Sequence, residues 1–105
     1  MPRFIVKLDQ YYMEWSTIVD APVTWGMTID EFREYYRAEY GIAGMRDLDK
    51  RMARVEKNGT SAFDAMSAED LISGNRAGPK ETELAVHEVF QAYCLRESVR
   101  GWLPT

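Results

Sequence analysis

The sequence predicts a single α+β domain, in which an N-terminal antiparallel β-hairpin, or a small sheet built on it, packs against two to four helices. Two extended runs open the chain, and segments with a helical spacing of apolar residues follow them. Of the 105 residues, 46% are hydrophobic, which is enough to build one core. No repeat or long linker divides the chain, so we treat residues 1–105 as one domain.

The predicted hairpin begins with a short strand over residues 3–8. Phe4, Val6 and Leu8 share one face, which is the two-residue period of a strand with one face more buried than the other. A tight turn is expected at residues 9–10, between this run and the next.

The second strand is predicted to be longer and to cover residues 11–19. Tyr12 and Glu14 share a face with a serine and an aspartate, so we expect this face to be half exposed to solvent. Pro22 should leave the sheet, because proline cannot donate to a central ladder. Residues 23–25 then either resume an edge strand or fold over the core.

A capping box marks the start of the first helix. Thr28 and Glu31 are three residues apart, so each side chain can accept a hydrogen bond from the backbone of the other, and the helix begins at Ile29. Apolar and aromatic residues recur along it every three or four positions. Gly41 ends it, because glycine adopts the left-handed conformation past a C-cap at little cost.

A second helix is predicted over residues 45–57, ending at Asn58-Gly59. Its surface is basic, but acidic residues are interleaved, which is more typical of a solvated helix face than of a nucleic-acid site. The basic residues are Arg46, Lys50, Arg51, Arg54 and Lys57.

The C-terminal part is predicted to hold a short helix after Ser67 and a turn-rich loop over residues 74–79. Pro79 can open the last helix. The alternative is a strand over residues 89–95, but the length of the segment favours a helix. Trp102 is expected to fold back onto the body.

Composition limits the classes of function and the compartment. The net charge of −4 argues against a dedicated nucleic-acid binder, so we expect no direct contact with nucleic acid. There is no run of about 18 apolar residues and no signal-peptide pattern, and Cys94 is the single cysteine. We therefore expect a cytoplasmic protein without a membrane span.

No catalytic or metal-binding motif stands out. His87 and Cys94 are seven residues apart, about 10.5 Å along a helix, which is too far for a thiolate–imidazole pair. Glu83 could share a metal with His87, but the chain has no second histidine to complete a zinc site. Glu14 lies among aromatic residues and could act as a general acid, although a solvated sheet surface is the favoured interpretation. We expect no enzyme, no cofactor and no metal.

Aromatic residues are the more informative feature, at 12% of the chain. Exposed tyrosine and tryptophan are favoured at the centres of protein interfaces. We predict a partner-binding surface on the hairpin and the first helix, made of Tyr12, Glu14, Trp15, Glu31, Glu34, Tyr35 and Glu39. The alternative is a small-ligand site, for example for a nucleotide, in which Arg76 and Asn75 act together with the tyrosines.

The segments EWSTIVDAPVT and GMTIDEFREYY resemble parts of the small, acidic, aromatic-rich accessory proteins that bacteriophages encode. The resemblance implies a non-enzymatic inhibitor of a bacterial defence system, of the anti-CRISPR type, that occludes a basic surface of a protein or nucleoprotein complex. It covers the first half of the chain and transfers no functional residue. An unpaired hairpin edge also favours a homodimer.

Overall fold

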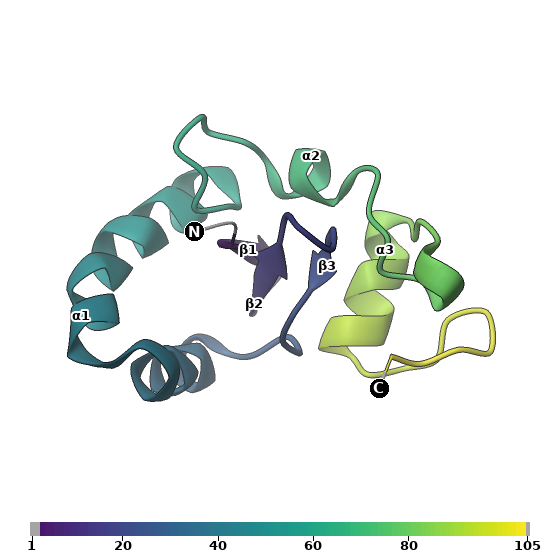
Figure 1. Ribbon diagram of the computed structural model, residues 1–105, viewed down its shortest axis with the longest axis horizontal. Coiled ribbons are helices and arrows are strands. Elements are labelled where there is room, and N and C mark those ends of the chain that lie inside the picture. The colour runs from purple at the N-terminus through teal and green to yellow at the C-terminus, as the bar shows by residue number, and fades with distance from the viewer. Residues whose placement is uncertain (1–2, 105) are drawn as a thin grey trace.

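A three-stranded antiparallel sheet lies between two layers of helical segments in the computed structural model, which describes residues 3–104 (Figure 1). The predicted α+β class is therefore confirmed. The strand order is β1-β2-β3. The strands are β1 (Arg3–Leu8), β2 (Tyr11–Ser16) and β3 (Ala21–Pro22). The helical segments are α1 (Ile29–Asn58), α2 (Ala68–Ile72), the 3-10 turn η1 (Pro79–Glu81), α3 (Val86–Val89) and the π-helical turn η2 (Phe90–Cys94).

The second strand is shorter than predicted. It ends at Ser16, whose side-chain oxygen accepts hydrogen bonds from the backbone N–H groups of Ile18 and Val19 and so closes a turn. The chain then returns as β3, where Pro22 pairs with Trp15. The prediction that this proline leaves the sheet was wrong, because β3 is an edge strand and an edge tolerates a missing donor.

The outer edge of β1 is covered by the chain itself. The backbone N–H of Lys7 donates to the carbonyl of Gly59, and that of Ser61 donates to the carbonyl of Ile5. Thr60 forms a bridge with Val6 between these two bonds. The free hairpin edge that favoured a homodimer is thus already paired within one chain.

Helix α1 consists of two halves that meet at a kink at Gly41 (Figure 1). The capping box is confirmed: Thr28 Oγ1 accepts from Glu31 N at 3.3 Å, and Glu31 Oε1 accepts from Thr28 N at 2.9 Å. Gly41 has φ 67° and ψ −161°, and Gly59 has φ 97° at the C-cap. The predicted break at Gly41 and the predicted end at Gly59 therefore both correspond to left-handed glycines.

The last helix begins later than predicted. Pro79 opens only the short turn η1, in which Lys80 and Glu81 have positive φ angles of 55° and 59°. Helix α3 begins at Val86, where Glu88 Oε1 accepts a hydrogen bond from the backbone N–H of Ala85 at 2.9 Å. The helical interpretation of the segment that follows is confirmed by η2.

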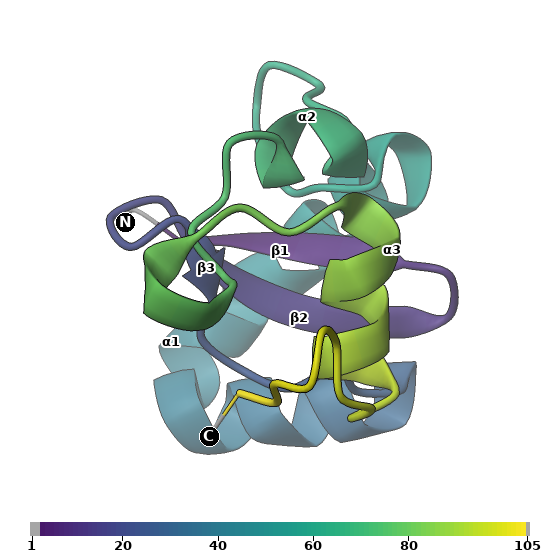
Figure 2. The same cartoon turned by 90° about the vertical axis from the view of Figure 1, so that its right-hand side faces the viewer.

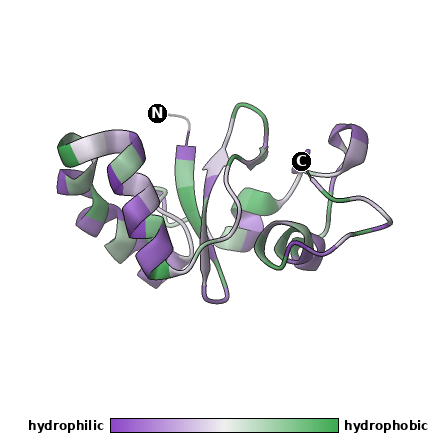
Figure 3. Ribbon diagram, turned by 90° about the horizontal axis from the view of Figure 1, so that it is seen from below, coloured by the Kyte–Doolittle hydropathy of each residue, from purple (hydrophilic) through white to green (hydrophobic). Residues whose placement is uncertain are grey.

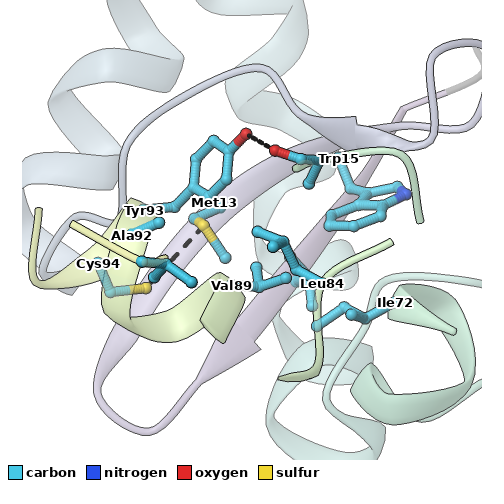
Figure 4. Packing of buried hydrophobic residues seen from close by; sticks show 11 residues of the cluster. Met13, Trp15, Ile72, Leu84, Val89, Ala92, Tyr93 and Cys94 are labelled. Carbon is cyan, nitrogen blue, oxygen red and sulfur yellow. Dashed lines mark hydrogen bonds between the residues drawn. The ribbon is translucent and has the colours of Figure 1, made fainter. Parts of the chain in front are cut away.

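The sheet separates two hydrophobic clusters. On one face, Ile5 and Tyr12 pack against α1. On the other, Met13 and Trp15 pack against the C-terminal segments (Figure 4). Figure 3 shows the helical segments on the two sides of the sheet. Figure 2 shows α3 crossing the strands on the face opposite α1. Trp102 packs against the second of these clusters, as predicted. None of the helices in residues 3–104 combines the length and hydropathy needed to cross a bilayer.

Candidate functional site

The three hairpin residues predicted to contact a partner are buried. Tyr12, Glu14 and Trp15 expose only 5%, 0% and 1% of their surfaces. Tyr12 faces α1, whereas Trp15 lies in the cluster shown in Figure 4. The expectation that one face of the hairpin is half exposed to solvent was wrong, because helical segments cover both faces.

Glu14 forms the centre of a closed polar cluster beneath the first half of α1. Its carboxylate accepts hydrogen bonds from the hydroxyls of Tyr35, at 2.5 Å, and Tyr40, at 2.7 Å, and Nη1 of Arg3 lies 3.7 Å away. Burial, together with donation to Glu14, raises the pKa of both tyrosines, so their hydroxyls remain protonated donors. A carboxylate with no exposed surface cannot reach a substrate, so the cluster is structural.

This cluster also accounts for Tyr35, a predicted partner-binding residue. Its ring is only partly exposed, and its hydroxyl points inward to Glu14. Tyr40 and Arg3 were not predicted from the sequence. The surplus of tyrosines in the first helix was the available signal, but their shared acceptor lies on a strand and is distant in the sequence.

A second polar contact joins the hairpin to the far half of α1. Glu56 accepts hydrogen bonds from Nζ of Lys7 at 2.7 Å and from the hydroxyl of Tyr12 at 2.5 Å. These two donors lower the pKa of Glu56. The hydroxyl of Tyr12 is therefore hydrogen-bonded within the molecule.

The remaining predicted partner residues are exposed on the first half of α1. We call Glu31, Glu34 and Glu39 the acidic face. Glu31 closes the capping box, and the hydrogen bond with the backbone of Thr28 lowers its pKa. Glu34 Oε1 lies 3.3 Å from Nη2 of Arg37. Ile42, just after the kink, exposes 77% of its surface.

The predicted ligand residues Asn75 and Arg76 do not form a site with the tyrosines. Asn75 is buried, and its amide makes four hydrogen bonds with the backbone of Ile72, Ala77 and Leu84. It therefore fixes the loop. Arg76 is exposed, but it lies on the side of the sheet opposite the tyrosines of α1. The sequence of this loop already favoured a structural turn over a ligand site, and the hydrogen bonds of Asn75 agree with the structural role.

A basic groove of about 460 Å³ runs between β1, the second half of α1 and the loop after Gly59. The sequence identified the basic residues of α1, but not the contributions of Arg3 and Phe63 from outside that helix. Phe63 exposes 89% of its surface, and the guanidinium of Arg54 lies 4.2 Å from the centre of its ring. We call this feature the basic groove; its lining residues are Arg3, Phe4, Asp47, Lys50, Arg51, Arg54, Ser61 and Phe63.

The residues considered for nucleophilic or metal chemistry are separated. Cys94 is buried beside Met13, whereas His87 is exposed. Glu83 is engaged with the backbone, because its Oε2 accepts from the N–H of Gly74 at 2.9 Å. Within residues 3–104, no three histidine, cysteine, aspartate or glutamate side chains come together in a way that could hold a metal ion.

Comparison with known proteins adds no family to this description. No protein-family model matches the chain, and neither a curated protein nor a solved structure matches it.

Proposed function

We propose that this chain is a non-enzymatic interaction protein that acts in the cytoplasm of a bacterial cell and occludes a basic surface of a protein or nucleoprotein complex. A phage-encoded inhibitor of the anti-CRISPR type would work in this way. The observation that carries the proposal is the exposure of the acidic face, together with that of an apolar side chain, Ile42, three residues after Glu39 in the sequence.

The acidic face suits recognition of a cationic partner. Its carboxylates lie on one rigid half-helix, whose start is capped and whose inner side is anchored by Phe32 and Tyr36 in the core. Charges on a rigid element lose little conformational freedom on binding, and a charge of opposite sign on the partner increases the rate of association.

Ile42 supplies the apolar contact that charges alone do not. An apolar side chain with 77% of its surface exposed, three residues after Glu39 in the sequence, can serve as an apolar contact with charged residues around it. Charged contacts would then govern the approach of the partner, and burial of Ile42 would lengthen the lifetime of the complex.

The test is capture of partners from bacterial lysate by the tagged full chain, with and without nuclease, read by mass spectrometry. The variant Glu34→Lys/Glu39→Lys reverses two charges of the acidic face. Asp64→Lys/Glu97→Lys makes the same change in net charge at exposed positions elsewhere and serves as the matched control. We expect one stoichiometric protein that survives nuclease, is lost with the first variant and is retained with the control.

Two results would contradict the proposal. One is capture that both double variants reduce equally, which would indicate dependence on net charge alone. The other is the absence of any stoichiometric partner. Circular dichroism of each variant establishes that a lost partner does not reflect a lost fold.

A further inference from the structure

The basic groove combines positive charge with an open aromatic ring, and the proposed function uses neither. It lies on the second half of α1, whereas the acidic face lies on the first half. Four cationic side chains and one acidic side chain line it, namely Arg3, Lys50, Arg51 and Arg54 against Asp47. The local balance is therefore positive in a chain whose net charge is −4. Local charge, rather than net charge, sets the affinity of a groove for an anion.

Two of the guanidinium groups are already held in position. Arg51 donates to the hydroxyl of Tyr36 and, at 2.9 Å, to the carbonyl of Arg3. Nε of Arg54 donates to the carbonyl of Ser61 at 2.8 Å. A ligand that binds here loses little affinity to the ordering of these side chains, because the fold has ordered them already.

Phe63 provides a flat surface at the rim of the groove. Arg54 lies over its ring at 4.2 Å, and 89% of the residue is exposed, so the ring is open to a second stacking partner. A phenylalanine this exposed contributes little to the core. A flat ring beside fixed cations is the combination with which proteins bind nucleotides of single strands, through base stacking and phosphate contacts.

We propose that the basic groove binds a nucleoside phosphate, with the base stacked on Phe63 and the phosphate facing Lys50 and the guanidinium of Arg54. The nucleotide is either free or part of a single-stranded nucleic acid, since both present the same chemistry. This binding departs from the expectation, drawn from net charge, of no contact with nucleic acid. It is independent of the acidic face.

The test uses the full chain and three probes: AMP, a fluorescently labelled oligouridylate and inorganic phosphate. Phe63→Ala removes the stacking surface, and Phe63→Trp restores one. Lys50→Gln removes a groove charge. Because Phe63 and Lys50 are exposed, these variants retain the fold. The matched controls are Ile18→Ala, which truncates an apolar side chain that is 75% exposed, and Lys57→Gln, which removes a cation of α1 outside the groove.

We expect Phe63→Ala to weaken nucleotide binding about 5-fold or more, and Phe63→Trp to restore it. Lys50→Gln should make the negative slope of log affinity against log salt for the oligonucleotide shallower by about 0.7. The controls should bind as the unaltered chain does. Binding of AMP with this pattern identifies a free nucleotide as sufficient, and binding of the oligouridylate alone identifies a single strand.

Three outcomes overturn the proposal. The first is that neither nucleotide probe binds. The second is that inorganic phosphate binds as tightly as AMP and Phe63→Ala has no effect, which would leave only a general anion site. The third is that Lys57→Gln weakens binding as much as Lys50→Gln, which would indicate nonspecific attraction.

Discussion

The hydroxyl of Tyr40 lies 2.7 and 2.8 Å from the two carboxylate oxygens of Glu14, and so joins the first half of α1 to the middle strand of the sheet. Glu14 has no exposed surface, and Tyr35 donates to the same carboxylate. A buried carboxylate is tolerated only when such donors replace the hydrogen bonds of water. The contact therefore holds a helix and a strand in a fixed relation.

Replacing the buried carboxylate should destabilise the fold. Glu14→Gln removes the charge that the two tyrosines and Arg3 surround, and hydrogen bonds to charged groups contribute more than neutral ones. We expect the free energy of unfolding to fall by about 2 kcal/mol, measured by urea denaturation. The exposed Glu39→Gln is the control and should change it by less than about 0.5 kcal/mol. Equal effects of the two substitutions would show that the cluster contributes nothing to the free energy of unfolding.

The kink at Gly41 reverses the effect on stability that replacing a helical glycine with alanine normally has. Gly41→Ala in a continuous helix would stabilise it by about 0.5–1 kcal/mol. At φ 67° and ψ −161°, however, alanine is strained, although no atom within 4 Å obstructs its Cβ. We expect a loss of about 1–3 kcal/mol in the free energy of unfolding, measured in urea. A gain in stability would indicate that α1 is straight in solution.

The ion pair between Glu88 and Arg100 should make stability depend on pH. Oε1 of Glu88 accepts from Nη2 of Arg100 at 2.7 Å, and this bond, followed by that from the backbone of Ala85, lowers its pKa from 4.5. A carboxyl group whose pKa is lower in the folded state stabilises the fold at pH values above its unfolded-state pKa. This stabilisation is lost as the pH falls through its folded-state pKa. Thermal unfolding measured from neutral pH to about pH 3 should therefore show that Glu88→Gln loses less stability on acidification than the unaltered chain does.

The matched control for this pH series is Glu69→Gln, which removes an exposed carboxylate of α2. This variant should lose as much stability on acidification as the unaltered chain does. If Glu88→Gln and Glu69→Gln give the same profile, the contact with Arg100 does not contribute to acid unfolding.

Cys94 should be unreactive in the folded protein. Burial raises the pKa of its thiol to about 12, and Gly26 packs so closely that an added Cβ would lie 2.6 Å from the sulfur. Thiolate is the reactive form, so a disulfide reagent at neutral pH should label the native chain slowly and the urea-unfolded chain at once. Rapid labelling without denaturant would mean that η2 opens readily.

Local features of the fold could be predicted from the sequence, because they depend on neighbours in the chain. The hairpin turn, the capping box of Thr28 and the stops at Gly41 and Gly59 all follow from backbone preferences within a few residues. The start of the last helix was misplaced for a related reason. Pro79 is a good local start, but the bonds of Asn75 to Leu84 close the intervening residues into a loop that contains only the short turn η1.

The sequence by itself determined the α+β class, the order of the elements and the excess of tyrosine in the first helix. Only the tertiary structure decided which residues remain at the surface. Helical segments pack on both faces of the hairpin, one of which period-2 alternation alone leaves half exposed, so Tyr12 and Glu14 on that face and Trp15 on the other are all interior residues. The basic groove likewise depends on Arg3 and Phe63 meeting α1 from elsewhere in the chain. Local preferences act over a few residues, whereas burial and grooves depend on contacts between distant segments.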